Sequence, residues 1–183
     1  MSTQTHKKIV AISGSLRAGS SNHAILNFLK SLTPPTIDYV IYDGLASLPH
    51  FDPGLDGDDP PEKVTELREL LAGADGIIIC TPEYAYGVPG SLKNALDWTV
   101  SSGSLVDKPL ALITASTGGE NAHRALLLIL GALSANVLEN ATLLISFIRS
   151  KMDGDGNVSD EETKNKLEKA FARLLSESEF TEF

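Results

Sequence analysis

The chain has a single cysteine, Cys80, and it has no long run of apolar or basic residues. One cysteine excludes an intrachain disulfide, which fits a reducing compartment. The longest apolar run, Ala125 to Leu130, is far too short to cross a bilayer. The segment from Met1 to Lys8 is polar and then basic, so it lacks the apolar stretch of a secretory signal. We therefore expect a cytoplasmic protein.

Positive charge is also scarce, because 15 lysines and arginines stand against 24 acidic residues and the formal net charge is −9. A chain with this charge repels nucleic acid and anionic membranes, so neither is expected as a partner. A hydrophobic fraction of 42% is typical of a folded globular protein. At this length the whole chain, residues 1–183, is predicted to form one domain.

Five apolar segments alternate with five segments of helical periodicity. Unbroken apolar runs of this kind are typical of strands that are covered on both faces. The predicted strands are residues 8–13, 37–42, 76–80, 109–115 and 141–148. The predicted helices are residues 22–32, 61–71, 91–100, 121–135 and 160–175. Residues 48–61 are rich in proline and aspartate, and they are predicted to form a long surface loop.

This alternation predicts an α/β protein with a parallel sheet, helices on both faces and right-handed crossovers. For a chain of this length we expect a flavodoxin-like three-layer sandwich, with a five-stranded sheet in the order 2-1-3-4-5. Such sheets bind ligands beyond the carboxyl ends of the strands, where the strand order reverses. The loops after the first, third and fourth strands are therefore expected to meet.

The first of these loops, residues 14–22, joins a buried strand to the start of a helix. A helix N-terminus presents free N–H groups, and the loop adds hydroxyls, an amide and Arg17, so phosphate is a natural ligand. The loop matches neither a Walker motif nor a dinucleotide-binding turn, so a phosphate monoester such as that of FMN fits better. The alternative is an ordinary turn in which Ser21 or Asn22 caps the helix.

The second loop, residues 81–90, holds Tyr84 and Tyr86 between prolines and glycines. A backbone restricted in this way can direct its N–H and C=O groups at the polar edge of a flavin ring. Either tyrosine can pack near that ring, or both can serve as aromatic plugs of a structural turn. In the third loop, residues 116–120, two glycines let the backbone approach a flat ligand closely. Taken alone, that loop fits an ordinary strand-to-helix turn better than a binding loop.

The sequence contains no pair of nucleophile and base, and no cluster with metal-ligand spacing. Cys80 ends a buried strand and is expected to be inert. A calcium loop at residues 153–164 is rejected because Val158 and Lys164 occupy the positions of the required glycine and glutamate. The histidines are scattered along the chain, at His6, His23, His50 and His123. We therefore expect a bound cofactor to supply the chemistry.

Several motifs occur in a characteristic order along residues 7–150. They are Gly14-Ser15-Leu16-Arg17, Ser20-Ser21-Asn22, Thr81-Pro82-Glu83-Tyr84, Val88-Pro89-Gly90, Leu92-Lys93-Asn94-Ala95, Asp97-Trp98 and Ser116 with Gly118-Gly119. This pattern resembles the NAD(P)H-dependent FMN reductase family, which includes chromate, quinone and azo-dye reductases of flavodoxin-like fold. The first two loops carry most of the resemblance, and the third contributes little.

The resemblance implies a set of residues that bind FMN. Ser15, Arg17, Ser20 and Asn22 would hold the phosphate, and the second loop would line the flavin ring largely through its backbone. Many members carry asparagine where this chain has Ala85, so one side-chain hydrogen bond is absent here. The expected cofactor-binding residues are Ser15, Arg17, Ser20, Ser21, Asn22, Pro82, Glu83, Tyr84, Ala85, Tyr86, Ser116, Thr117, Gly118, Gly119 and Glu120.

The implied activity is an FMN-dependent oxidoreductase that passes electrons from NAD(P)H to a small acceptor in a ping-pong cycle. The acceptor would be a quinone, an azo compound, a metal oxyanion or free flavin. Residues 125–133 are apolar on nearly every side, which favours a homodimer or homotetramer, as is common in the family. Two alternatives stay open: a flavodoxin-type electron carrier without its own NAD(P)H activity, and a phosphate-binding hydrolase or regulatory module without flavin.

Overall fold

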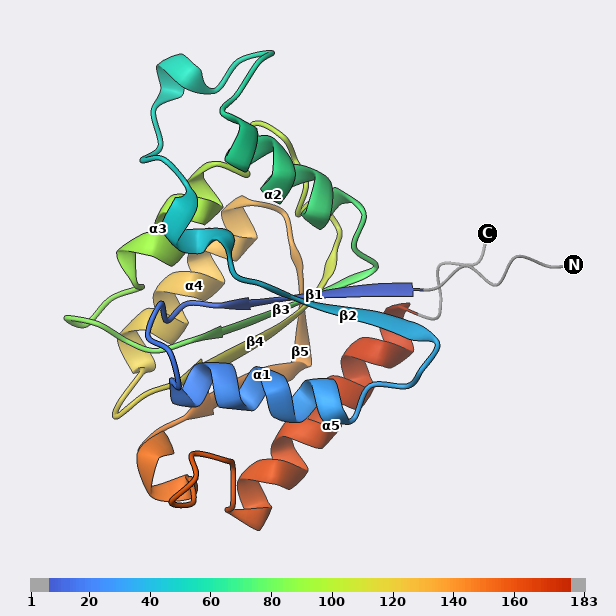
Figure 1. Cartoon of the computed structure of the whole chain (residues 1–183), viewed down its shortest axis with the longest axis vertical. Coiled ribbons are helices and arrows are strands. Elements are labelled where there is room, and N and C mark those ends of the chain that lie inside the picture. The colour runs from blue at the N-terminus through green and yellow to red at the C-terminus, as the bar shows by residue number, and fades with distance from the viewer. Residues whose placement is uncertain (1–6, 179–183) are drawn as a thin grey trace, which may run out of the picture.

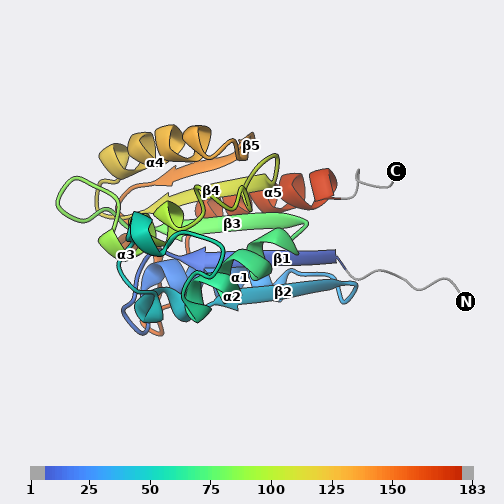
Figure 2. The same ribbon diagram turned by 90° about the horizontal axis from the view of Figure 1, so that it is seen from above.

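A computed structural model describes residues 7–178 of the chain. Five parallel strands form one sheet in the order β2-β1-β3-β4-β5, which confirms the predicted topology (Figure 2). The strands are β1 (Lys7–Ser13), β2 (Ile37–Tyr42), β3 (Gly76–Thr81), β4 (Pro109–Ala115) and β5 (Asn136–Ile145). Residues 1–6, which include His6 and most of the polar N-terminal segment, lie outside the described part.

Helices cover both faces of the sheet, so the predicted three-layer sandwich is confirmed (Figure 1). One face carries α1 (Ser21–Ser31) and α5 (Glu161–Ser178), and the other carries α2 (Glu62–Ala72), α3 (Gly90–Asp97) and α4 (Glu120–Ala132). Each layer has its own apolar core. On one side Leu26 and Phe171 pack against the sheet, and on the other Leu67, Trp98 and Leu126 do so. The central strand β3 is buried along its whole length, which explains its unbroken apolar sequence.

The prediction for the fifth strand is wrong at both ends. The strand was expected at residues 141–148, but β5 spans Asn136–Ile145 and is followed by a short 3-10 helix, η3 (Ile148–Lys151). The pairing of β4 with β5 shifts register between Leu110 and Leu112. The exposed Glu139 and Asn140 lie in the first half of β5, opposite this irregularity. These polar residues interrupt the apolar pattern, so the first half of the strand escapes prediction.

The segment from Leu48 to Pro61 was predicted to be a surface loop, but it is tied firmly to α3. It follows the short 3-10 helix η1 (Gly44–Ser47) and contains a second one, η2 (Pro53–Leu55). The carbonyl oxygen of Pro49 accepts hydrogen bonds from Asn94 Nδ2 at 3.0 Å and from Trp98 Nε1 at 2.9 Å. The ring of Phe51 packs edge-on against Trp98, with 5.0 Å between centroids. Two residues of the family motif, Asn94 and Trp98, thus fix this segment.

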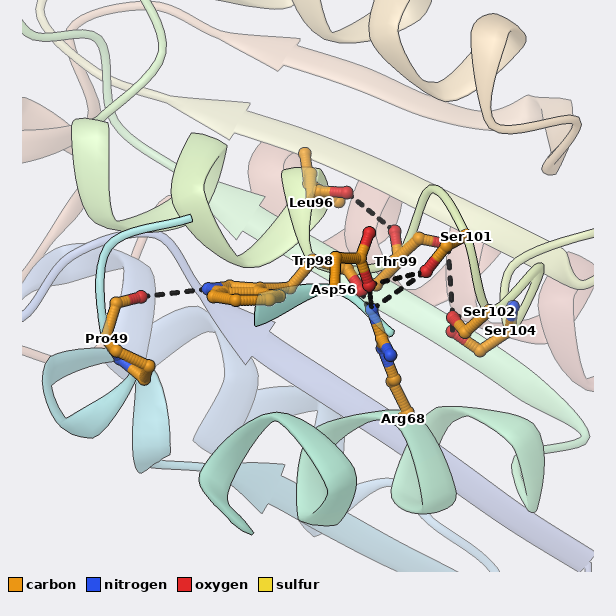
Figure 3. A network of polar contacts seen from close by, with 9 residues as sticks. All are labelled: Pro49, Asp56, Arg68, Leu96, Trp98, Thr99, Ser101, Ser102 and Ser104. Carbon is orange, nitrogen blue, oxygen red and sulfur yellow. Dashed lines mark hydrogen bonds and ion pairs between the residues drawn. The ribbon is translucent and has the colours of Figure 1, made fainter. Parts of the chain in front are cut away.

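A polar network closes the same region on its other side (Figure 3). The guanidinium of Arg68 donates to Asp56 Oδ1 at 2.5 Å and to the carbonyl oxygen of Trp98 at 2.8 Å. The hydroxyl of Ser101 joins this network by donating to Asp56 at 2.7 Å. The network connects α2, the residues after α3 and the 48–61 segment. It therefore stabilises the end of α3, the helix that begins at Gly90, the last residue of the second predicted binding loop.

Candidate functional site

A cavity of about 230 Å³ lies at the carboxyl ends of β1, β3 and β4. Four separate segments of the chain form its wall. The lining residues are Ser15, Arg17, Ser20, Ser21, Asn22, Pro82, Glu83, Tyr84, Ala115, Ser116, Thr117, Ile148 and Arg149. The structure therefore brings together most of the residues expected from the sequence. It does not include Ala85, Tyr86, Gly118, Gly119 and Glu120 in the wall.

The β1–α1 loop (residues 14–20) lies directly against the end of β3. The N–H of Gly14 donates to the carbonyl oxygen of Cys80 at 2.8 Å. A Cβ atom at this glycine would lie 2.1 Å from Thr81 Oγ1, which leaves no room for any other residue. Gly14 thus allows the first loop to pass close to the second.

Ser20 is the residue that caps α1. Its Oγ accepts a hydrogen bond from the N–H of His23 at 3.2 Å. The expectation that Ser21 or Asn22 would be the cap is therefore wrong, because the helix begins one residue earlier than predicted. The N–H groups of the first helical turn, those of Ser21 and Asn22, have no partner within the helix. They are available to an anion at this end of the cavity.

The side chain of Asn22 is buried, and it joins α1 to two strands. Its Nδ2 donates to the carbonyl oxygen of Ala115 at 3.3 Å, and its Oδ1 accepts from the thiol of Cys80 at 3.3 Å. Burial raises the pKa of the Cys80 thiol far above its ordinary value, so the thiol stays protonated as a donor. Because its amide has these partners, Asn22 orients the loop with its side chain and can contribute its backbone N–H to a phosphate.

The β3–α3 loop (residues 82–89) contains a tight turn. Tyr84 and Gly87 exchange backbone hydrogen bonds of 3.0 and 2.9 Å, and both Ala85 and Tyr86 have positive φ, at 48° and 58°. These angles are typical of a two-residue type I′ turn, in which asparagine or glycine is preferred. Tyr84 lines the cavity, and its Oη lies 3.4 Å from Ser15 Oγ. The tip of the turn, Ala85 and Tyr86, does not line the cavity, and Tyr86 is 83% exposed.

Glu83 connects the second loop to the third. Its carboxylate accepts hydrogen bonds from the N–H groups of Asn121 at 2.8 Å and Ala122 at 2.9 Å, at the start of α4. Its own N–H donates to Ser116 Oγ at 3.1 Å. The carboxylate thus caps α4, where the helix dipole favours negative charge. Glu83 is the sole acidic residue of the cavity wall, and its charge is directed into that helix.

The β4–α4 loop (residues 116–119) contributes Ser116 and Thr117 to the wall. Gly119 has φ 118° and precedes the first turn of α4, where Leu144 packs so closely that a Cβ atom would lie 2.9 Å from it. Gly118 lies beside Glu83, since a Cβ atom built on it would be 3.8 Å from Glu83 Oε1. The two glycines therefore shape the loop from behind the cavity.

Sequence reasoning missed three residues of the wall: Ala115, Ile148 and Arg149. The segment after β5 is held against the third loop by two backbone hydrogen bonds, from Phe147 N to Thr117 O and from Ile148 N to Ser116 O, each 3.1 Å. The available signal was an arginine directly after a predicted strand. It was missed because only the loops after the first, third and fourth strands were expected to form the site, whereas the segment after β5 also lines the cavity.

The chemistry of the wall fits a phosphate monoester with an attached polar ring. Serine hydroxyls, helix N–H groups and two arginines supply hydrogen-bond donors. The one carboxylate of the wall, that of Glu83, accepts its hydrogen bonds from the start of α4. Within residues 7–178, no group of three or more histidine, cysteine, aspartate or glutamate side chains is arranged to hold a metal ion. In the same part of the chain, no helix has the length and hydropathy that a membrane span requires.

Fold and cavity together define a flavodoxin-like α/β protein with a site at the carboxyl edge of its sheet. The chain belongs to the NADPH-dependent FMN reductase family, whose model matches residues 7–149. It is therefore an oxidoreductase that uses FMN as cofactor and NAD(P)H as electron donor, and it passes the electrons to a small acceptor. The resemblance noted in the sequence is confirmed.

Three individual proteins illustrate this relationship. A quinone reductase of Escherichia coli K12 is 34% identical over 167 residues, which cover 87% of this chain and 89% of that protein. An NAD(P)H-dependent FMN reductase of Pseudomonas aeruginosa is 31% identical over 172 residues, which cover 91% of this chain and 92% of that protein. The solved structure of FerB, a flavoenzyme NAD(P)H:(acceptor) oxidoreductase from Paracoccus denitrificans, superposes on this chain with a TM-score of 0.75. The two sequences are 27% identical, and the match covers 94% of this chain and 97% of FerB.

Proposed function

We propose that the cavity binds FMN and that the protein reduces quinones with electrons from NAD(P)H. The observation that carries this proposal is the composition of the wall, which is rich in donors and arginines and has its one carboxylate directed into α4. A flavin phosphate requires such an environment. Two apolar cores on one sheet support the proposal that residues 1–183 form a single FMN-binding domain.

The phosphate would occupy the end of the cavity beside α1. There Ser15, Ser20 and Ser21 offer hydroxyls, and the first turn of the helix offers N–H groups. Arg17 is exposed and its guanidinium has no partner within residues 7–178, so it is available for a charge-assisted bond. Asn22 would contribute its backbone N–H while its side chain orients the helix.

The ring would lie along the second and third loops. Pro82, Glu83 and Tyr84 would face it largely through backbone groups, with Ser116 and Thr117 opposite. Ala85 and Tyr86 at the exposed tip of the turn would border the entrance, and Gly118, Gly119 and Glu120 would hold the third loop in place. The bound FMN supplies the redox chemistry, and the protein binds and orients the reactants.

The names of two relatives support a quinone as the acceptor. The Escherichia coli relative is named a quinone reductase, and a relative from Burkholderia, 34% identical over 167 residues, is named a 2-hydroxy-1,4-benzoquinone reductase. Tyr84 and Tyr86 are exposed, and they would offer aromatic surface to a flat acceptor at the entrance. Azo compounds, metal oxyanions and free flavin are acceptors of the same class.

The outer face of α4 supports a homodimer, or a homotetramer built from such dimers. Leu128 is 74% exposed, and its neighbour Leu127 is also exposed. The exposed Gly131, one turn further along α4, would allow close approach of a second copy. Apolar side chains gathered on one helix face are typical of an interface. The buried free thiol of Cys80 supports a reducing compartment such as the cytoplasm.

The proposal is tested by steady-state kinetics with the FMN-loaded protein, with NADH or NADPH as donor and benzoquinone as acceptor. We expect quinone-dependent oxidation of the nicotinamide and parallel double-reciprocal lines, because donor and acceptor use the same side of the flavin in turn. An FMN-loaded protein that is reduced by dithionite but not by NADH or NADPH would instead be a flavodoxin-type electron carrier.

A further inference from the structure

The five arginines of the chain fall into two groups. Three have partners within the fold: Arg68 binds Asp56 (Figure 3), Arg124 donates to Asn121, and Arg173 pairs with Glu177. The other two, Arg17 and Arg149, form no side-chain hydrogen bond or ion pair within residues 7–178. Both of them line the cavity. The free guanidiniums of the described chain are thus concentrated at one place.

Arg149 is held there by its neighbours. Ile148 is buried, and its N–H donates to the carbonyl oxygen of Ser116 at 3.1 Å, so the backbone before Arg149 is fixed against the third loop. The turn at residues 155–158 that follows η3 borders a groove whose other wall includes Ser20, the cap of α1, and His23 of that helix. The segment after β5 therefore runs past the N-terminus of α1, which is the phosphate end of the cavity.

We propose that Arg149, on the segment after β5, is a second guanidinium ligand of the FMN phosphate beside Arg17 of the β1–α1 loop. This inference rests on the proposed FMN site. A phosphate monoester carries roughly −1.5 to −2 charges near neutral pH, so one arginine leaves it incompletely neutralised. In a chain of net charge −9, a second arginine offsets the repulsion that a phosphate dianion meets. Arginine also matches phosphate geometry by donating two parallel hydrogen bonds.

The test compares FMN with riboflavin, which has the same ring but no phosphate. The full-length protein is stripped of flavin, and the quenching of flavin fluorescence gives the dissociation constant of each ligand. Four proteins are compared: the wild type, Arg149→Ala, Arg149→Lys and Arg173→Ala. Arg173 lies on α5, pairs with Glu177 and is absent from the cavity wall, so its variant controls for the loss of one positive charge.

We expect Arg149→Ala to weaken FMN binding by about tenfold or more, because a charge-assisted hydrogen bond is lost. Riboflavin binding should stay within about twofold of the wild type. Arg149→Lys should recover part of the loss, and Arg173→Ala should bind both ligands as the wild type does. The dependence of FMN affinity on salt concentration should also become weaker in Arg149→Ala.

Other outcomes overturn the inference. If Arg149→Ala binds FMN as tightly as the wild type, Arg149 does not contact the phosphate. If FMN and riboflavin lose affinity equally, Arg149 contacts the ring or supports the loop. If affinity for FMN is unchanged but the KM for NADPH rises, Arg149 binds the nicotinamide cofactor instead. If the wild-type protein binds no FMN at all, the proposed function itself fails.

Discussion

The phenol oxygen of Tyr84 lies 3.4 Å from the hydroxyl oxygen of Ser15, although the two residues are 69 positions apart. They meet because β1 and β3 are neighbours in the sheet, and the loops that follow them leave the same edge. The strand order reverses between β1 and β3, and open α/β sheets bind ligands at such a point. This contact therefore links the topology of the sheet to the composition of the cavity.

Arg17 is expected to contribute to FMN affinity without contributing to stability. Its side chain is exposed and has no partner in residues 7–178, so Arg17→Ala should leave the free energy of unfolding unchanged. FMN binding should weaken by about tenfold or more through the loss of a charge-assisted bond. Fluorescence titration measures the affinity for FMN, and urea unfolding measures the stability of the protein. Unchanged FMN affinity would remove Arg17 from the phosphate site.

Glu83 is expected to order the start of α4. Glu83→Ala should cost about 1–2 kcal/mol of stability, because the N–H groups of Asn121 and Ala122 lose their acceptor. Amide hydrogen exchange should accelerate at these two residues, and Glu83→Gln should restore part of the protection. Glu69→Ala, at an exposed position of α2, is the matched control. Equal protection of Asn121 in wild type and Glu83→Ala would contradict the capping role.

Asn22 is expected to join α1 to the sheet. Asn22→Ala should destabilise the protein by about 1–2 kcal/mol, since the buried thiol of Cys80 and the carbonyl of Ala115 lose their partner. The exposed Asn27, on the same helix, provides the control, and Asn27→Ala should have little effect. Urea unfolding gives the free energy of unfolding of the wild type and of both variants. If Asn22→Ala is as stable as Asn27→Ala, the side-chain amide of Asn22 has no structural role.

Ala85 is strained by its backbone conformation. Its φ of 48° costs an L-residue roughly 1–2 kcal/mol, more than glycine loses in conformational entropy. Ala85→Gly should therefore stabilise the protein, by about 0.5–1 kcal/mol. Ala172→Gly in the middle of α5 should do the opposite and cost about 1 kcal/mol. Thermal unfolding gives the sign of each effect, and destabilisation by both would argue against strain at Ala85.

The ion pair between Arg68 and Asp56 (Figure 3) makes the stability of the protein depend on pH in the acid range. Hydrogen bonds from Arg68 and then from Ser101 lower the pKa of Asp56 below its ordinary value of 3.8. A carboxyl pKa that folding lowers stabilises the folded state above 3.8, and this contribution is lost as the pH falls through the pKa of the folded state.

Asp56→Asn should therefore be less stable than the wild type at about pH 7, and the difference should shrink at about pH 3. Urea unfolding at the two pH values measures it. Asp58→Asn, at an exposed position of the same segment, controls for the change in net charge. A difference between wild type and Asp56→Asn that stays constant with pH would show that the Asp56 carboxylate is not the group that titrates.

The fold could be predicted because its main features depend on patterns that a sequence displays directly. The unbroken apolar run of β3, for example, reflects a strand covered on both faces. The first half of β5 could not be predicted, since Glu139 and Asn140 lie at a register shift that depends on pairing with β4. The firm attachment of residues 48–61 also depends on a distant residue, Trp98.

The candidate site was predictable where a loop follows a clear strand, as at Ser15 and Tyr84. Arg149 escaped because only the loops after β1, β3 and β4 were expected to meet, whereas the segment after β5 also contributes to the wall. The sequence also did not reveal which atoms of a site residue have partners in the protein. The carboxylate of Glu83 and the amide of Asn22 both bind protein groups, and that follows from tertiary contacts alone.

The most direct test of the account is the visible spectrum of the purified full-length protein during titration with NADH and NADPH in the absence of air. We expect a flavin absorption band at about 450 nm, either as isolated or after incubation with FMN, and its loss when the nicotinamide is added. Full return of the band on adding benzoquinone would complete the cycle. A protein that remains colourless after incubation with FMN would contradict the claim that these loops bind a flavin.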